Sequence, residues 1–485
     1  MLNVGENTIF AQSLDAMELI GRKQETNELR LVNDSKEPEF VVVYGRRRVG
    51  KTFLVNQFFE NHFAFKVTGV AERNAKEKQL MNFGEALRRY GSPLCPNPTN
   101  WKEAFNSLRI LLENLPTKEK QVVFIDELPY MCTRRSDLVS ALEHFWNDWA
   151  CTRDNLLLIV CGSATSWIVK NIIRNKGGLH NRLTRKIYLK PFNLSETRDY
   201  LESRGLVFEQ KDLLETYMVM GGIPYYLRML EKGKSLAQNI DEMFFVRKGR
   251  LDGEFDNLYA ALYEESDQYV KVVRAISKRN RGLTREEIIQ ETGLSNGGGL
   301  STILADLDQC DIIRSYAAYG KKKKSILYQL TDFYTYFYLK FVEKHNASEK
   351  GYWQYQLNTP AQNAWAGYAF ELLCLYHYPQ IEKKLGITGV QTSVSSWQSK
   401  DAQVDLLIDR ADRIINLCEI KFWSGEYVIT KSYAEELRRK IQSFQQELKT
   451  RKAVHLVMVT TYGLKRNEYF NMVQNEVTME DLFGA

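Results

Sequence analysis

The chain has 485 residues, of which 44% are hydrophobic and 26% are charged. This length allows two to four domains, each with a core of its own, and the composition excludes wholesale disorder. The formal net charge of +6 is too small to indicate nucleic-acid binding by itself. No apolar run approaches the ~18 residues of a membrane helix, and the first residues lack the pattern of a signal peptide. The seven cysteines form no CxxC pair, so we expect reduced thiols in a cytoplasmic protein with no membrane partner.

The first part of the chain alternates short apolar segments with longer amphipathic ones. Three apolar runs of strand length, at residues 40–45, 122–126 and 156–163, each end at a polar or glycine-rich corner that helix-like sequence follows. Strands with this pattern are buried on both faces, so we predict an α/β fold with a parallel sheet covered by helices. We assign residues 1–194 to this domain and residues 195–262, where a helical period dominates, to a helical lid.

The remaining sequence indicates two further domains. Residues 263–345 have the order helix, helix, glycine-containing turn, helix and two-stranded ribbon, which is typical of a winged helix-turn-helix. Thr284 followed by Glu287 is the pattern of a capping box at the start of its second helix. Residues 346–485 combine a long helix, two strand-like segments, another helix and a further strand, which predicts a C-terminal α/β domain.

Residues 45–52 predict a phosphate-binding loop. They follow an apolar strand, precede a helix-like segment and match the pattern G-x-x-x-x-G-K-[ST]. The glycines let backbone N–H groups curl around phosphate oxygens, the lysine reaches the β- and γ-phosphates, and the threonine hydroxyl is offered to Mg²⁺. We therefore expect ATP and Mg²⁺ as cofactors, held by Gly45, Arg46, Arg47, Arg48, Val49, Gly50, Lys51 and Thr52.

Polar residues after the next two apolar strands extend this site. Asp126 ends one strand, where its carboxylate can hold Mg²⁺ through water, and Glu127 can polarise an attacking water as general base. Ser163 can touch the γ-phosphate or the attacking water, or it can simply end its strand. Arg182 can place a guanidinium on the transition-state charge, in cis or from a neighbouring subunit, or it can be a solvated surface residue.

Six segments together resemble a known family: GRKQETNELRLV, the P-loop, FIDELPYM, CGSATSW, RLTRKIYLKPF and MGGIPYYL. They look like the archaeal-type ATPases of the STAND/AAA+ group, and the resemblance covers about residues 10–235. It implies a nucleotide-driven switch, commonly with a winged-helix domain behind the ATPase. Many such proteins also carry a C-terminal domain related to restriction-endonuclease-like nucleases of the PD-(D/E)XK type.

The last domain contains residues that such a nuclease needs. Asp405 precedes an apolar strand, and a return strand would place Glu419 beside it and Lys421 on the same face as Glu419. The two carboxylates can bind Mg²⁺ against a scissile phosphate, and Lys421 can orient water or stabilise developing charge. Glu371, on the preceding helix, resembles the acidic residue that completes the metal site in this nuclease fold. The alternative is a decayed nuclease that only binds, with these carboxylates as solvated hairpin ends.

The basic tip of the predicted wing indicates a DNA partner. Its lysines at positions 321–324 can meet phosphates, although such a run can also be a solvated loop and winged helices can dock proteins. Ser295, Asn296 and Ser301 would begin the recognition helix. We therefore expect a Mg²⁺-dependent ATPase switch that binds DNA and cleaves it conditionally. The alternative is a nucleotide-regulated DNA-binding or scaffold protein with an inert nuclease fold, and a protein partner or homo-oligomer is compatible with both.

Overall fold

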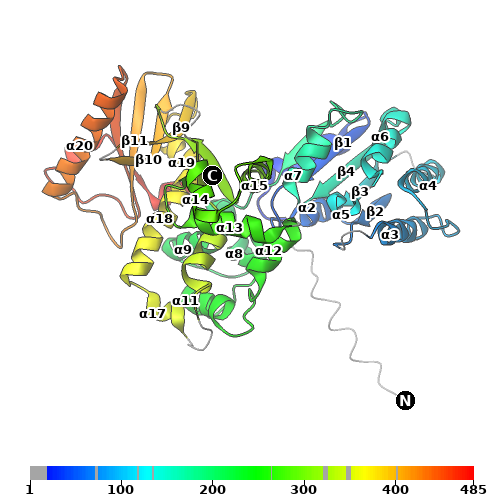
Figure 1. The fold of residues 1–485 in the computed structure, drawn as a ribbon, viewed down its shortest axis with the longest axis horizontal. Helices are drawn as coiled ribbons and strands as arrows, with labels where there is room; N and C mark the ends of the chain where they lie inside the picture. The colour runs from blue at the N-terminus through cyan, green and yellow to red at the C-terminus, as the bar shows by residue number, and fades with distance from the viewer. Residues whose placement is uncertain are drawn as a thin grey trace, which may run out of the picture. The chain divides into compact units, whose positions relative to one another are not determined.

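The computed structural model describes residues 19–484 except residues 72–74, 117–118, 134–135, 264, 321–325, 346–350 and 400–401. The chain divides into two compact units, Met1–Lys190 and Pro191–Ala485, and Figure 1 shows their elements. In the described part of the chain, no helix is both long enough and apolar enough to cross a membrane.

The first unit is built on a five-stranded parallel sheet with the strand order β2-β3-β4-β1-β5. Its strands are β1 (Glu39–Tyr44), β2 (Phe65–Thr68), β3 (Gln121–Asp126), β4 (Leu156–Gly162) and β5 (Arg185–Tyr188). Its helices are α1 (Lys23–Asp34), α2 (Lys51–Phe58), α3 (Lys76–Arg89), α4 (Trp101–Asn114), α5 (Leu128–Met131), α6 (Leu138–Asp148) and α7 (Thr165–Ile168). Every residue of β3 and β4 is buried, which confirms the predicted parallel sheet with two covered faces.

Aromatic side chains from α3, α4 and α6 form much of the core beside this sheet. The ring centroid of Phe83 lies 5.9 Å from that of Trp101 and 5.8 Å from that of Phe105. Phe145 stacks on Phe105 at 5.3 Å. Burying each such ring stabilises the fold by roughly 1.5–3 kcal/mol, and the packed core fixes the carboxyl ends of β1, β3 and β4.

The second unit begins with helices joined by tight turns. They are α8 (Leu194–Ser203), α9 (Gln210–Met220), α10 (Pro224–Leu227), α11 (Leu236–Ile240) and α12 (Glu254–Leu262). Helix α9 ends before Gly222, which has φ 64°. A Cβ at Gly222 would lie 2.1 Å from the carbonyl oxygen of Phe192, so only glycine is accommodated there.

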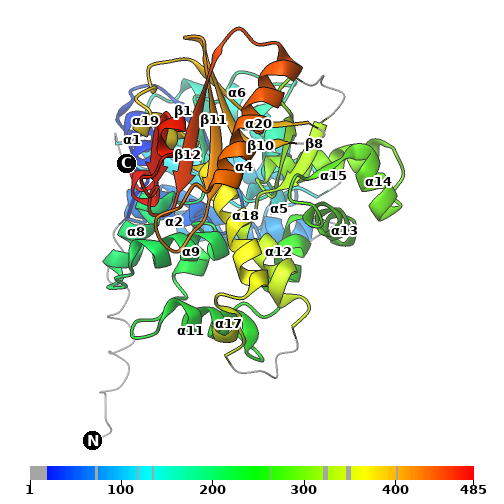
Figure 2. The same cartoon turned by 90° about the vertical axis from the view of Figure 1, so that its left-hand side faces the viewer.

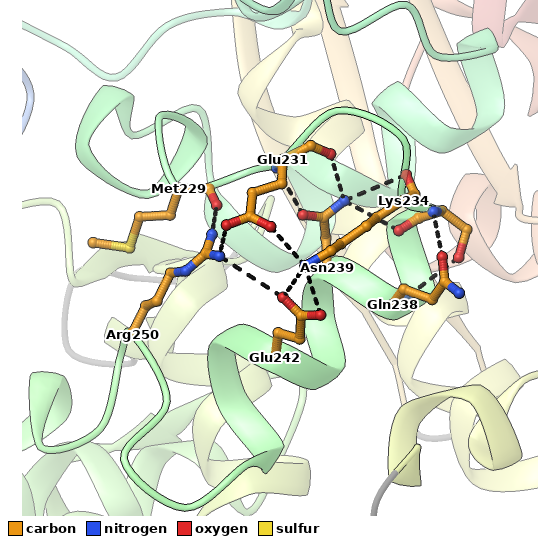
Figure 3. Close-up of polar contacts among 8 residues, drawn as sticks. Met229, Glu231, Lys234, Gln238, Asn239, Glu242 and Arg250 are labelled. Carbon is orange, nitrogen blue, oxygen red and sulfur yellow. Dashed lines mark hydrogen bonds and ion pairs between the residues drawn. The ribbon is translucent and has the colours of Figure 1, made fainter.

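A surface network of charged side chains closes the connection from α10 to α12 (Figure 3). The ammonium of Lys234 lies 2.6 Å from Glu231 and 2.5 Å from Glu242, and Arg250 pairs with the same two carboxylates. The amide of Asn239 accepts from the Glu231 backbone N–H at 2.8 Å. Exposed ion pairs contribute only about 0–1 kcal/mol each, so this network orders the loop more than it stabilises the unit.

Residues 266–330 form three helices and a small antiparallel sheet with the strand order β6-β8-β7. These elements are α13 (Ser266–Ser277), β6 (Leu283–Thr284), α14 (Arg285–Thr292), α15 (Gly298–Gln309), β7 (Ile313–Ala317) and β8 (Ile326–Leu330). The capping box predicted between Thr284 and Glu287 is confirmed, because each side chain accepts the backbone N–H of the other residue. Lys321, Lys322, Lys323 and Lys324 lie outside the described residues.

An aromatic helix, α16 (Phe333–Phe337), connects this region to the C-terminal part. Phe337 packs edge to face against Trp353 of α17 (Tyr352–Gln356) and Trp365 of α18 (Pro360–Tyr376), with ring centroids 4.9 and 5.4 Å apart. Tyr336 packs in the same way on Tyr368 at 4.9 Å. These contacts give α18 a fixed position in the second unit.

The C-terminal sheet has the strand order β13-β12-β11-β10-β9. Its strands are β9 (Thr392–Gln398), β10 (Gln403–Arg410), β11 (Ile414–Lys421), β12 (Ala453–Thr460) and β13 (Asn475–Thr478). The accompanying helices are α19 (Tyr378–Lys384), α20 (Lys431–Leu448) and α21 (Met479–Leu482). β10 pairs antiparallel with β9 and β11, whereas β11, β12 and β13 are parallel. Figure 2 shows α20 along this sheet. Leu437 and Phe444 of α20 belong to the core of this part.

Candidate functional sites

The loop at residues 45–52 joins β1 to α2, as predicted. Gly45 has φ 141°, and a Cβ there would lie 2.3 Å from the Leu189 carbonyl oxygen. Gly50, with φ 94°, precedes the first residue of α2. Both positions therefore use backbone that side chains disfavour, and they turn the loop back over the helix N-terminus.

The basic residues of the loop point in different directions. Lys51 is buried, and its ammonium donates to the carbonyl oxygens of Gly45 at 2.9 Å and Arg46 at 2.8 Å. Arg46 is also buried, Arg47 donates to the Tyr130 hydroxyl at 3.4 Å, and Arg48 has φ 72°. Lys51 is the cation that lies inside the curve of the loop, so it is the one suited to phosphate oxygens.

Thr52 and Asp126 are hydrogen-bonded to each other. The Thr52 hydroxyl donates to Asp126 Oδ2 at 2.8 Å, and Asp126 is buried at the end of β3. Burial raises the pKa of Asp126, the Glu127 charge adds to this rise, and the bond from Thr52 opposes it. A hydroxyl and a carboxylate are oxygen ligands of the kind Mg²⁺ prefers, so these two residues fit the expected ion.

Glu127 is anchored at the neighbouring strand. Its backbone is left-handed, with φ 49°, and its Oε2 accepts from the Ser163 backbone N–H at 3.1 Å and from the Ser163 hydroxyl at 2.9 Å. Ser163 itself is buried at the end of β4. The structure thus brings Thr52, Asp126, Glu127 and Ser163 together at one edge of the sheet, with Ser163 positioning the Glu127 carboxylate.

Arg182 stands apart from this group. It is exposed in the segment before β5, and none of the described hydrogen bonds joins it to Glu127 or Ser163. Arg185, three residues later, pairs with Glu28 at 3.4 Å. The role of Arg182 on the transition-state charge stays a prediction.

Arg22 contacts the phosphate-binding loop, although its sequence position did not indicate this. Its side chain is buried, and its two terminal nitrogens donate to the carbonyl oxygens of Val49 at 3.1 Å and Lys190 at 2.7 Å. Glu25 lies 3.9 Å from the same guanidinium. Arg22 therefore ties the phosphate-binding loop to Lys190, the last residue of the first unit. The position of Arg22 as the second residue of the segment GRKQETNELRLV was the only signal in the sequence.

The C-terminal residues predicted for a nuclease site also come together. Leu406 of β10 pairs with Cys418 of β11, and this antiparallel register places Asp405 opposite Glu419. The Lys421 ammonium lies 3.2 Å from Glu419 Oε1. α18, which carries Glu371, packs against β10 and β11.

Two further side chains, both from α20, reach this site. The Lys440 ammonium lies 2.7 Å from Glu419 Oε2, and the Tyr433 hydroxyl donates to Glu419 Oε1 at 2.9 Å. Both were missed, although they lie beside the apolar stripe of α20 formed by Ala434, Leu437 and Phe444, because sequence alone does not show that this stripe packs next to Glu419. Together with Lys421, they surround Glu419 with donors.

The pKa values of the three carboxylates diverge. Burial raises the pKa of Glu371 to about 8, and the Asp405 charge adds to the rise. Burial also raises the pKa of Asp405. Burial acts in the same direction on Glu419, but Lys440 and Lys421 outweigh it and lower the pKa of that carboxylate. Such divergence is typical of functional sites as well as of structural ion pairs.

The carboxylates do not form a ready-made metal site. Among the described residues, no group of three or more His, Cys, Asp or Glu side chains is arranged to hold an ion. Asp405 and Glu419 have the donor chemistry that Mg²⁺ and Mn²⁺ prefer, but Glu419 is engaged by the two lysines. A bound ion would have to compete with these ammonium groups.

The region of residues 266–330 contributes an arginine near Asp405. Arg314 of β7 donates to Gln329 at 2.6 Å, and Gln329 donates to the hydroxyl of Tyr368, one turn before Glu371, at 3.0 Å. Burial lowers the pKa of Arg314, and the charge of Asp405 is among the groups that oppose this. The C-terminal carboxylates therefore lie in the field of a cation from the preceding region.

The expected recognition helix, α15, begins at Gly298. Ser295, Asn296 and Ser301 are exposed around its start. Arg285 holds this turn by donating to Asn296 at 2.9 Å and to the Gly297 carbonyl oxygen at 3.0 Å. The glycine-rich N-terminus is thus tied to α14.

Comparison with known proteins finds a family similar to the first part of the chain. Residues 19–230 match the model of a family described as an ATPase domain predominantly from Archaea. This match supports ATP binding and hydrolysis by this part of the chain. An uncharacterized protein of Methanocaldococcus jannaschii, MJECL04, is 24% identical over 429 residues, which are 87% of this chain and 91% of that protein.

Two solved structures are similar at lower identity. The Walker-type ATPase PABY2304 of Pyrococcus abyssi is 19% identical, with 67% of this chain and 96% of that chain covered and a TM-score of 0.49. The ORC2 protein of Aeropyrum pernix, solved as ADPNP–ADP complexes, is 13% identical, with 75% and 96% covered and a TM-score of 0.40.

Proposed function

We propose that this protein is a Mg²⁺-dependent ATPase switch that binds DNA and cleaves it through its C-terminal domain. The observation that carries the ATPase part is the bond between Thr52 and Asp126, with Lys51 inside the loop and Glu127 held beside it. These are the groups that phosphoryl transfer to water requires.

Each residue has a separate task in this proposal. Lys51 binds the phosphate charge, and Thr52 and Asp126 supply oxygen ligands to Mg²⁺. When bound, Mg²⁺ neutralises charge that develops on the phosphate oxygens. Glu127 accepts a proton from the attacking water, and Ser163 keeps its carboxylate oriented.

Two substitutions test the ATPase assignment. Lys51→Ala should abolish binding of fluorescent ATP because the phosphates lose their cation. Glu127→Gln should bind ATP normally and hydrolyse it about 10²–10⁴-fold more slowly, since it cannot take the proton. Glu85→Gln, at an exposed position on α3, is the matched control. Hydrolysis by Glu127→Gln at the control rate would remove the general-base assignment.

In this proposal, Arg22 couples the phosphate-binding loop to the end of the first unit. Its guanidinium bonds the carbonyl oxygens of Val49, in the phosphate-binding loop, and Lys190, after which the second unit begins. A change in loop conformation on nucleotide binding would therefore act directly on the residue that precedes the junction. A bidentate arginine suits this role because its fork is rigid.

Asp405, Glu419 and Lys421, with Glu371 nearby, support cleavage of nucleic acid. A second candidate function is that of a regulated binding or scaffold protein with an inert nuclease fold. The ion pairs of Glu419 with Lys421 and Lys440 favour this candidate, because they occupy the carboxylate that would hold the metal.

Incubation of supercoiled plasmid with Mg²⁺ or Mn²⁺, with and without ATP, separates the two candidates. Asp405→Asn should abolish nicking and leave ATP hydrolysis intact. Asp412→Asn, in the exposed turn between β10 and β11, is the control. Absence of cleavage by the wild type, together with no Mn²⁺ binding in a titration, would favour the inert fold.

DNA binding by the middle region is proposed to run through Lys321–Lys324. Replacing all four by Ala should flatten the salt dependence of duplex binding by ~0.9 log unit for each phosphate that is no longer neutralised. Helix α15 carries no lysine or arginine and two aspartates, Asp306 and Asp308, which favours protein docking by this region. Unchanged affinity and salt slope in the quadruple variant would support docking.

A further inference from the structure

An exposed aromatic edge lies beside the Glu419 site. Trp423 and Tyr462 are 53% and 41% exposed. Each follows its strand by two residues, and the ends of those strands, Lys421 and Thr460, are register partners in a parallel pair. The two aromatic residues therefore belong to the same carboxyl edge of the C-terminal sheet.

The aromatic edge is continuous with the candidate site. The ring centroids of Trp423 and Tyr427 are 6.0 Å apart and those of Tyr427 and Tyr433 are 5.7 Å apart, with interplanar angles of 89° and 75°. The Lys421 ammonium lies 5.1 Å from the Tyr433 ring centroid, and the Tyr433 hydroxyl bonds Glu419. Linked ring contacts thus run from the exposed indole to the carboxylate.

The backbone around Trp423 is well anchored. Its N–H donates to the Thr461 hydroxyl at 3.0 Å. Tyr427 exchanges backbone hydrogen bonds with the opposite loop, donating to the Gly463 carbonyl oxygen at 2.8 Å and accepting from the Lys465 N–H at 3.0 Å. The Trp423 indole therefore extends from a fixed loop, so the entropy cost of ordering this loop on binding is small.

The charge at this edge complements a phosphate backbone. Lys465 and Arg466 are exposed in the loop that pairs with Tyr427, and Lys421 lies at the inner end of the edge. Two exposed acids lie nearby in sequence: Glu426, between Trp423 and Tyr427, and Glu468, two residues after Arg466. Cations interleaved with aromatic rings are the combination by which proteins hold unpaired nucleotides.

We propose that this aromatic edge binds unpaired bases of single-stranded DNA and leads the strand to Glu419 and Lys421. The inference rests on the proposed function and specifies its substrate. In a duplex the base faces are already stacked, so an exposed indole gains a partner only from an unpaired base. Trp423 is 53% exposed and meets Tyr427 at an interplanar angle of 89°, so it is not stacked on that ring.

The test measures binding of fluorescein-labelled oligodeoxythymidylate and of a duplex of equal length by the full chain. Trp423→Ala should weaken single-strand binding by about 5- to 150-fold, the value of one stacked base, and leave duplex binding unchanged. Trp423→Phe should recover most of the affinity. Tyr355→Ala, at an 81% exposed aromatic of the same unit, is the control. Thermal melts of all variants check that the exposed position leaves the fold intact.

The outcomes separate this inference from the proposed function. Wild-type binding of duplex but not of single strands, or equal single-strand binding by Trp423→Ala and the control, would overturn the aromatic edge and leave the DNA-binding switch standing. Binding of neither form would overturn both. Tighter, Trp423-dependent binding of oligouridylate would replace DNA by RNA. A change of oligomeric state in Trp423→Ala without a change in affinity would make the edge a protein interface.

Discussion

Lys440→Met should lower the stability of the C-terminal sheet, and bound Mn²⁺ should restore it. The Lys440 ammonium lies 2.7 Å from Glu419, and the two side chains are only 11% and 8% exposed. Removing one partner of a buried pair typically costs about 3–5 kcal/mol, because the other charge is left uncompensated. Lys421, 3.2 Å from the other oxygen, and Tyr433 remain, so we expect the lower end, about 3 kcal/mol.

The same substitution should increase the affinity for Mn²⁺. An ammonium beside Glu419 repels a divalent ion there, and at an effective dielectric constant of about 20 two unit charges ~4 Å apart interact by ~4 kcal/mol. Loss of this repulsion should tighten Mn²⁺ binding at least about tenfold. Calorimetric titration measures the affinity, and hydrogen exchange of β11 and α20 amides, with and without Mn²⁺, measures local stability.

Two further variants make this prediction decisive. Arg439→Met, exposed on the same helix, should change neither stability nor Mn²⁺ affinity appreciably. Lys440→Met combined with Glu419→Gln should regain most of the protection without Mn²⁺, because no charge is left unpaired. If Mn²⁺ protects Lys440→Met no more than it protects the double variant, Glu419 is not a metal ligand.

Three other predictions concern single contacts. Ser163→Ala should slow ATP turnover roughly tenfold at unchanged ATP affinity, because Glu127 loses one of its two donors and a bond to a charged group is worth about 1.5–3 kcal/mol; equal turnover would show that Ser163 only ends its strand. Burial lowers the pKa of His377 to about 4. The unfolded chain therefore binds the proton at a higher pH than the folded chain does. The free energy of unfolding should fall by roughly 3 kcal/mol as pH drops from about 6.5 to 4. His377→Gln, which can still accept from Leu194, should flatten the pH dependence of the melting temperature, and an unchanged profile would contradict the assignment. Arg22→Ala should remove the ATP-induced change in proteolysis near residue 190, and an identical digestion pattern would refute the coupling.

Local sequence was sufficient to predict where the loop and the strand-end carboxylates lie, because their requirements are local. Gly45 and Gly50 have backbone angles that favour glycine, and Lys51 follows them in sequence. Asp126 and Glu127 could be placed because a continuous apolar strand ends immediately before them. Parallel strands bring their carboxyl ends to one edge, so this part of the arrangement follows from strand assignment alone.

The missed residues depend on contacts between distant segments. Lys440 reaches Glu419 because α20 packs against the sheet with one face. Its spacing from Leu437 and Phe444 places Lys440 on that face, but it does not show that Glu419 lies opposite. Arg22 bonds Lys190, which is 168 residues away in the sequence. The sequence does not show whether a charged residue is exposed or buried. The tertiary packing has to be known before a buried charged residue of a site can be recognised.

The two candidate sites differ in how their central carboxylate is held. Both bonds from Ser163 go to Oε2 of Glu127, so Oε1 is the oxygen that can face an attacking water. On Glu419, Tyr433 and Lys421 contact Oε1 while Lys440 contacts Oε2. A carboxylate offers about four acceptor positions, and those of Glu419 are directed largely at protein donors. The geometry around Glu127 is therefore compatible with the proposed general-base role, whereas a metal ion at Glu419 would compete with Lys421, Lys440 and Tyr433 for the carboxylate oxygens.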